Sequence, residues 1–491
     1  MRFLRMPLKG MCIELRPNLC SGHVLLQFEE PIRDKRKTRI VIKEDDVHIV
    51  ENGVDGDSEL VLRHDCFGMD IERISVFIVS GEYISFRFNY THIDLDALQR
   101  AGVHVEIHPL KLSFEERSHV VALQCSKCYH EVVPGCKYNR LREFPSGFVD
   151  PSEFFCHNHG DTSTAKPPSL VPGPSDMYYG LNYVVLNMAV LHSRVIKCEG
   201  HIYCKRCMWL LGICILNDAA VKLWADALRL QPVATLPRQL FQQPTLTQLV
   251  LRMLKDFWPD AQHHFCTGNN RALLVATMPN RHQHYMLLEI LEFKLRILRK
   301  VETTSSVAEA KLQQFYACKL YFRVFGSCQH DPSILAAWQE QITIPKLEMS
   351  PYSFLALQRR LTSNMELVPN AWRYNTAEEK LQLSYFFYET EEQELLRQQK
   401  EQEQQQQPKQ GPEVKPKQQQ LKEYETDTGV DASLDEEDES DDEHSDTDSE
   451  THNALHHKYA PIAAYEQQLV KRWPKQKQLK HMSNSPDGAN L

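Results

Sequence analysis

The sequence predicts an α+β protein with an N-terminal β-sandwich or barrel-like region, a zinc-ribbon-like clasp, a C-terminal α+β region and a disordered C-terminal tail. Three observations lead to this prediction: β-branched runs dominate up to residue 120, two Cys-x-x-Cys pairs lie between residues 121 and 215, and the composition becomes Gln-rich and then acidic after residue 390. A chain of 491 residues has room for two or three domains. We expect a β-rich domain at 1–120, a zinc-clasp region with a Pro-rich insertion at 121–215, an α+β domain at 216–390 and a disordered Gln-rich and acidic tail at 391–491.

The first region is expected to consist of strands. The segments "GHVLLQFEE", "RKTRIVIKEDDVHIVEN" and "SELVLRHD" are rich in β-branched residues and alternate in polarity. The segment "ISVFIVSGEYISFRFNYT" predicts two strands joined at Ser80, Gly81 and Glu82, which is a hairpin signal. Consecutive strands without a helical pattern favour a β-sandwich or an open barrel.

The third region mixes two hydrophobic periods. The segments "DAAVKLWADALRL" and "TLTQLVLRMLKDFW" have apolar residues at helical spacing. The segments "RALLVATM", "HYMLLEILEFKLRIL" and "KLQQFYACKLYFRVFG" are predicted to be strands or buried elements. This mixture predicts an α+β fold for residues 216–390.

The tail carries the negative charge of the chain. Residues 431–450 contain 12 acidic residues and no Lys or Arg, so the net charge of −9 becomes −9 + 12 = +3 without them. A nearly balanced remainder argues against a nucleic-acid binder that acts through a large basic field. Polar segments of this kind bury too little apolar surface to fold, so we expect disorder. The tail is either a solvated segment that keeps the protein soluble or a docking segment. The stretch "VKRWPKQKQLKH" is either a nuclear address or a chance basic cluster.

Neither a membrane helix nor a secretion signal is evident in the sequence. No segment approaches the roughly 20 unbroken apolar residues of a membrane helix, and "MRFLRMPLKG" is not followed by the apolar stretch of a signal peptide. We therefore expect a soluble intracellular protein. In that setting, paired cysteines are metal ligands more often than disulfides, and the chain has 14 cysteines.

Two cysteine pairs have the spacing of zinc knuckles, Cys125 with Cys128 and Cys204 with Cys207. Thiolates are soft donors that suit zinc, and four of them close the coordination sphere, so the site would be structural. The alternative is two unrelated pairs of buried free cysteines. Further possible ligands lie between the pairs, and they leave open a second zinc or Cys198 in place of Cys204: Cys136, Cys156, His157, His159, Cys198 and His201.

The stretch "REFPSGFVDPSEFFCHNHG" places Cys156 and His157 in a loop between turn-prone segments. This dipeptide could be a nucleophile with its base, a pair of metal ligands, or a contact displayed to a partner. Adjacent residues of an extended segment point in opposite directions, which disfavours the nucleophile interpretation.

An ordered series of motifs resembles a known family. The segments are "CSKCYHEVV", "FPSGFVDPSEFFCH", "SDMYYGLNYVVLN", "CKRCMWLLG" and "LVPNAWR". Together they resemble the HECT-like ubiquitin-conjugating-enzyme-binding family over about residues 20–390. The resemblance implies a cytoplasmic and nuclear ubiquitin-protein ligase that binds a ubiquitin-charged conjugating enzyme and promotes ubiquitin transfer to substrate proteins. No membrane partner and no direct contact with nucleic acid are expected.

The same resemblance implies an alternative role. Family members associate with the metallo-β-lactamase endonuclease of the pre-mRNA 3′-end cleavage complex, and the loop that matches "SEFFCH" is thought to approach its zinc site. Cys156 would then contact a partner's metal, where a thiolate can displace a catalytic water. The third hypothesis is an unrelated zinc-ribbon interaction protein.

The chain departs from a HECT ligase in one respect. Such a ligase carries ubiquitin on a cysteine near the end of its folded domain, whereas this chain has no cysteine after Cys328. Cys266, Cys318 and Cys328 are the cysteines nearest to that place, and none of them is identified as a nucleophile. The catalytic residues are therefore unknown. A scaffold that aligns a charged conjugating enzyme with its substrate needs no thiol, because proximity itself supplies rate.

Overall fold

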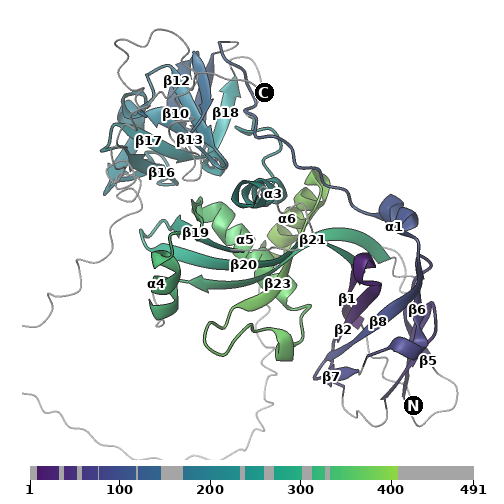
Figure 1. Ribbon diagram of the computed structural model, residues 1–491. Helices are drawn as coiled ribbons and strands as arrows, with labels where there is room; N and C mark the ends of the chain where they lie inside the picture. Colours follow the sequence, from purple (N-terminus) through teal and green to yellow (C-terminus); the bar gives the residue numbers. More distant parts are fainter. Residues whose placement is uncertain are drawn as a thin grey trace, which may run out of the picture. The chain divides into compact units, whose positions relative to one another are not determined.

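The computed structural model describes residues 8–32, 38–51, 58–75, 77–117, 120–144, 170–232, 238–258, 270–300, 312–326 and 332–406. Residues 1–396 form one compact unit, which is described here by itself, and residues 397–491 form a second unit. The predicted α+β class is confirmed, with β-sheets dominating over helices (Figure 1). Among the described residues, no helix is both long enough and apolar enough to span a membrane.

The largest sheet has ten strands, drawn from both ends of the compact unit. They are β1 (Leu8–Arg16), β2 (Ser21–Phe28), β6 (Phe67–Asp70), β7 (Ile78–Ser80), β8 (Tyr83–Ile93), β19 (Arg271–Thr277), β20 (Gln283–Lys300), β21 (Leu312–Phe325), β22 (Lys346–Glu348) and β23 (Gln382–Phe387). The main order is β22-β19-β20-β1-β2-β8-β6, with β21 and β23 beside β20 and β7 beside β8. The expected domain boundaries stay predictions, but the first and third regions share this sheet.

The two halves of the sheet meet on β20. This strand of 18 residues pairs with β21 from Tyr285 to Lys300, with register shifts between Ile290 and Leu295. On its other edge β20 pairs first with β19 and then, through Arg296–Arg299, with Cys12–Leu15 of β1. Figure 1 shows β20 and β21 extending from α4 and α5 toward β1. The extra length of β20 therefore supplies the hydrogen bonds that hold the N-terminal strands.

A second, three-stranded sheet accompanies the N-terminal strands. It contains β3 (Thr38–Ile42), β4 (Asp46–Glu51) and β5 (Ser58–Arg63), and its Val47 and Leu62 share one buried core with strands β1, β2 and β8. The predicted hairpin is confirmed, because β7 and β8 pair at Ser80 and Tyr83. Gly81 has φ of 59° in its turn, a conformation that glycine adopts without steric cost.

The middle region contains two sheets around a second core. One has β10 (Glu131–Cys136), β9 (Val121–Cys125) and β18 (Leu228–Pro232). The other has β11 (Arg140–Glu143), β12 (Asp176–Gly180), β13 (Tyr183–Asn187), β17 (Ala220–Trp224), β16 (Leu210–Ile215), β15 (His201–Cys204) and β14 (Val195–Cys198). Both sheets bury apolar side chains in the same cluster, so this region is a β-sandwich.

The helical interpretation of "DAAVKLWADALRL" is wrong. The segment forms β17, a 3₁₀ turn at Ala225–Ala227 and then β18. Every residue of β17 is buried, and β16 lies so close that a Cβ on Gly212 would meet the carbonyl oxygen of Lys222 at 2.0 Å. A fully buried strand has apolar residues on both faces, and this pattern resembles helical spacing.

The described helices are α1 (Leu95–Ala101), α3 (Leu246–Phe257), α4 (Pro332–Glu340), α5 (Pro351–Met365) and α6 (Glu391–Gln406). Short 3₁₀ turns cover Pro17–Leu19, Ile71–Arg73, Met188–Val190, His192–Arg194, Ala225–Ala227 and Asn370–Trp372. The predicted α3 is confirmed, and with α5 it covers one core over β19, β20 and β21. Thr245 caps α3 by accepting the N–H of Gln248, and Ser350 caps α5 in the same way.

The tail begins as a helix rather than as a disordered segment. Thr390 and Gln393 exchange hydrogen bonds between side chain and backbone, which is a capping box at the start of α6. Glu394 then accepts the first N–H groups of α3, at 3.1 Å from Leu246 N and 2.8 Å from Thr247 N, and pairs with Arg360 of α5 at 3.2 Å. These contacts stabilise α6 even though its sequence is polar. The rest of the predicted disordered tail, 407–491, lies outside the described residues.

A buried charge network lies where β1 joins the C-terminal strands. Glu14 is fully buried, and its carboxylate accepts hydrogen bonds from Lys319 at 2.6 Å and Tyr385 at 2.5 Å and pairs with Arg16 at 2.8 Å. Burial alone would raise the pKa of Glu14, but Lys319, Arg16 and His23 lower it to about 2. Burial lowers the pKa of His23 to about 4.

We predict that Glu14→Gln lowers the free energy of unfolding at pH 7 by about 3–5 kcal/mol, because Lys319 loses its buried counter-charge. In the wild type, Glu14 ionises more readily when folded, so its contribution is present above pH 4.5 and lost as the pH falls toward 2. His23 is protonated first in the unfolded chain, so stability also falls between pH 6.5 and 4. Urea unfolding across this range measures both effects.

Glu366→Gln is the matched control, because Glu366 is exposed and pairs with an exposed Lys9 at 3.4 Å. A surface pair of this kind contributes about 0–1 kcal/mol. An equal loss of stability in the two variants would contradict the role assigned to Glu14.

Candidate metal centre

The first knuckle joins β9 to β10. Cys125 ends β9, and the N–H of Tyr129 donates to the carbonyl of Cys125 at 2.9 Å. The N–H of Cys125 in turn donates to the carbonyl of His130 at 2.9 Å. Tyr129 has φ of 57°, a left-handed conformation that is costly for a residue with a Cβ. The loop therefore turns tightly enough to bring Cys128 back toward Cys125.

The second knuckle joins β15 to β16 and repeats this geometry. The N–H of Met208 donates to the carbonyl of Cys204 at 2.9 Å, and the N–H of Cys204 donates to the carbonyl of Trp209 at 2.8 Å. Met208 has φ of 58°. The sequences CSKCYH and CKRCMW thus fold into the same turn, one in each sheet of the β-sandwich.

The four predicted cysteines lie together. The Sγ atoms are 3.6 Å apart for Cys125 and Cys207 and 3.6 Å apart for Cys128 and Cys204, and all four lie within 4.8 Å of one another. A disulfide would need about 2.05 Å, whereas Zn–S bonds of about 2.3 Å in a tetrahedron place sulfurs roughly 3.8 Å apart. The spacing is therefore consistent with a tetrathiolate zinc site and with no open position for a substrate.

Backbone N–H groups near the sulfurs favour the thiolates, but burial outweighs them and raises the pKa of Cys125 and Cys207. Burial raises the pKa of Cys125, although N–H groups of Cys128 and Lys127 oppose that effect. Burial also acts to raise the pKa of Cys128, but the N–H of His130 and the neighbouring thiols lower it overall. Amide donors around the sulfurs orient and stabilise the ligands of a zinc site. A bound metal ion would stabilise the thiolates further, because their closely spaced negative charges otherwise repel one another.

The second knuckle also contacts the C-terminal region. The Trp209 ring stacks on Tyr352 of α5, with centroids 4.3 Å apart and an interplanar angle of 7°. The Tyr352 hydroxyl donates to the carbonyl of Leu210 at 2.9 Å, and the ammonium of Lys127 lies 4.6 Å from the Trp209 ring. The cysteine cluster is thus in contact, through one aromatic stack, with the first turn of α5.

The other expected ligands do not join the cluster. Cys136, Cys198 and His201 lie outside the only group of potential metal ligands among the described residues, so Cys204 rather than Cys198 completes the set. Cys156, with its neighbouring histidines at 157 and 159, lies outside the described residues. The partner-metal contact of Cys156 and the endonuclease role therefore stay predictions.

The candidate nucleophiles are only partly described. Cys318 in β21 is fully buried, as expected for a packing residue. Cys266 and Cys328 lie outside the described residues.

Two polar features had no signal in the sequence, namely the buried network of Glu14 and a cleft that contains Asn182 and Arg252. Their members are far apart in sequence, so no local spacing could have indicated them.

A comparison with protein families finds a match over most of the chain. A family model described as HECT-like ubiquitin-conjugating enzyme (E2)-binding matches residues 14–381. This range begins at Glu14 and includes both knuckles and the strands that carry them. No curated protein and no solved structure matches the chain.

We predict one zinc per chain in the purified protein and its loss in Cys204→Ser. Structural zinc contributes on the order of 10 kcal/mol to the folding of small domains, so the variant should melt at a lower temperature by several degrees or more. Plasma mass spectrometry and thermal unfolding measure the two effects. Cys198→Ser is the control, because Cys198 lies nearby in sequence but outside the cluster. A folded wild-type chain without metal would exclude the zinc site.

Proposed function

Because the chain belongs to the HECT-like ubiquitin-conjugating enzyme (E2)-binding family, we propose that it binds a ubiquitin-charged conjugating enzyme and promotes ubiquitin transfer to a substrate protein. The observation that carries this proposal is the match over residues 14–381, which spans most of the 491-residue chain. Its direct partners are a conjugating enzyme, ubiquitin and the substrate protein. On the same resemblance we place the protein in the cytoplasm and the nucleus, which fluorescence microscopy of the tagged chain would test.

We propose that ubiquitin passes directly from the conjugating enzyme to the substrate. Cys318 is fully buried, and a thioester would require its sulfur to reach the surface. The chain has no cysteine after Cys328, where a HECT ligase carries its nucleophile. A protein that holds both reactants in one geometry accelerates transfer without a covalent step of its own.

We predict transfer without a reducible ubiquitin adduct when the protein is incubated with a charged conjugating enzyme and substrate. The triple variant Cys266→Ala, Cys318→Ala and Cys328→Ala should retain transfer within about twofold, since no thiol takes part. Gels run with and without reductant detect the adduct. An adduct that forms with the wild type and disappears in the triple variant would contradict direct transfer, and binding without any transfer would exclude the ligase activity.

We place the contact for the conjugating enzyme at the tips of the two knuckles. Tyr129 and Met208 are 57% and 56% exposed at equivalent positions of loops whose sulfurs lie within 4.8 Å of one another. Lys127, Lys205 and Arg206 are exposed on the same loops, which contain no acidic residue. These cations also offset the net negative charge of a zinc tetrathiolate. Exposed apolar side chains with a basic rim suit a partner surface that is apolar and acidic.

We predict that the double variant Tyr129→Ala and Met208→Ala weakens binding of the conjugating enzyme at least tenfold, because large side chains at the centre of an interface contribute most of its binding energy. Surface plasmon resonance with a charged conjugating enzyme measures the change, and metal analysis confirms that the cluster is intact. The control is Leu19→Ala with Ile342→Ala, two apolar residues that are 58% and 84% exposed elsewhere. Unchanged affinity of the knuckle variant would place the contact on another surface.

A further inference from the structure

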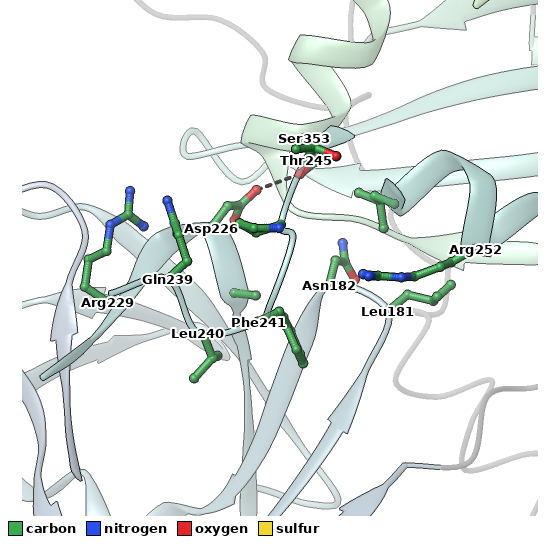
Figure 2. Close-up of a pocket in the computed structure, with 13 residues that line it drawn as sticks. Leu181, Asn182, Asp226, Arg229, Gln239, Leu240, Phe241, Thr245, Arg252 and Ser353 are labelled. Carbon is green, nitrogen blue, oxygen red and sulfur yellow. Dashed lines mark hydrogen bonds between the residues drawn. The ribbon is translucent and has the colours of Figure 1, made fainter. Parts of the chain in front are cut away.

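A cleft of about 130 Å³ lies where the β-sandwich, α3 and α5 meet (Figure 2). Its polar wall includes Asn182 from the turn between β12 and β13, Asp226 from the 3₁₀ turn before β18, and Arg252 from α3. Its apolar wall includes Phe241 and Leu249. In Figure 2, Asn182 and Arg252 lie toward one side of the cleft and Arg229 and Gln239 toward the other. This cleft is separate from the cysteine cluster.

Two side chains of the cleft are buried without their full set of partners. Asn182 is 5% exposed, and neither its amide nitrogen nor its amide oxygen has a hydrogen-bond partner among the described residues. Arg252 is 6% exposed, and its Nη2 likewise has no partner there. An unpaired polar group in a protein interior costs about 1–3 kcal/mol. Native proteins leave few such groups, so these two side chains point to a ligand.

The backbone around both residues is well fixed. The Nε of Arg252 donates to the carbonyl of His108 at 2.8 Å, which orients the guanidinium. The N–H of Ala225 donates to the carbonyl of Asn182 at 2.8 Å, which fixes the turn that carries the amide. The guanidinium is therefore oriented before a ligand arrives, and the amide is carried on a fixed turn, which reduces the entropy lost on binding.

The charge of the cleft favours a monoanion. Arg252 has no ion pair within 4 Å among the described residues, and a second arginine, Arg229, lines the other end. Asp226 is the acidic residue of the lining, and its Oδ2 accepts hydrogen bonds from the hydroxyls of Ser350 and Ser353. One negative charge would therefore balance the lining. The planar fork of a guanidinium beside an amide matches a carboxylate, whereas a phosphate dianion would be repelled by Asp226.

We propose that this cleft binds a carboxylate attached to an apolar group, the chain end of a peptide or protein. The carboxylate contacts Nη2 of Arg252 and the amide of Asn182, and the apolar side chain of the last residue lies against Phe241 and Leu249. A cavity of about 150 Å³ holds a benzene-sized group, so this cleft accommodates roughly one residue. The site is distinct from the proposed contact with the conjugating enzyme at the knuckles, and either proposal can fail without the other.

Calorimetric titration of the full chain with acetyl-Gly-Gly-Leu and with its C-terminal amide tests this proposal. We expect saturable binding of the free acid and at least tenfold weaker binding of the amide, because the amide carries no charge for Arg252. Arg252→Gln and Asn182→Ala should each weaken binding of the acid, the first at least tenfold. Arg359→Gln on α5 is the control, because Arg359 is an exposed arginine outside the cleft and should leave binding unchanged.

Thermal unfolding and metal content show whether each variant is folded. If Arg252→Gln does not fold, two other measurements test the proposal. They are the difference in affinity between the acid and the amide for the wild type, and the affinity of Asn182→Ala for the acid. No binding of the acid at millimolar concentration, or equal binding of acid and amide, would overturn the proposal. Competition by inorganic phosphate as strong as by the acid would overturn the choice of a carboxylate. Tighter binding of acetylglutamate α-amide would overturn the assignment to a chain end and favour acidic side chains.

Discussion

The pairing of β1 with β20 is the contact on which the rest of the compact unit depends. It joins residues 12–15 to residues 296–299, so the N-terminal sheet is completed only by a strand almost 300 residues later. Glu14 lies inside this junction, and its partner Lys319 is 305 residues away in sequence. Non-local pairing of this kind is slow to form, because a long loop must close before any contact is gained. The unit is therefore expected to fold cooperatively around β20.

Polar contacts then attach the β-sandwich and α6 to that sheet. Lys222 of β17 pairs with Glu348 of β22 at 3.1 Å, and both side chains are nearly buried. Ser353 of α5 donates to Asp226 at 2.7 Å, and Arg360 of the same helix pairs with Glu394. Because buried polar groups are costly unless paired, each contact specifies one arrangement of its partners. Helix α5 takes part in two of them and thereby contacts both the β-sandwich and α6.

In this arrangement we expect the cysteine cluster to have a structural rather than a catalytic role. Four sulfurs close a coordination sphere, so a bound zinc would hold the two sheets of the sandwich and present the knuckle tips. The aromatic stack of Trp209 on Tyr352 connects that site with α5, which also contributes Ser353 to the cleft. In the scheme proposed here the protein is a scaffold, with a partner at the knuckles, a carboxylate in the cleft and the reactive thioester on the conjugating enzyme.

The sequence by itself determined the features that depend on near neighbours. The Cys-x-x-Cys spacing and the residues that follow it encode each knuckle, Ser80 to Glu82 encode a hairpin, and the apolar stripe of "TLTQLVLRMLKDFW" encodes α3. Tertiary structure decided the rest. Residues 220–224 became a strand because burial on both faces outweighs local spacing, and α6 formed because Glu394 accepts hydrogen bonds from the N-terminus of α3. The pairing of β1 with β20 and the cleft at Arg252 join distant residues, and only the folded chain brings such residues together.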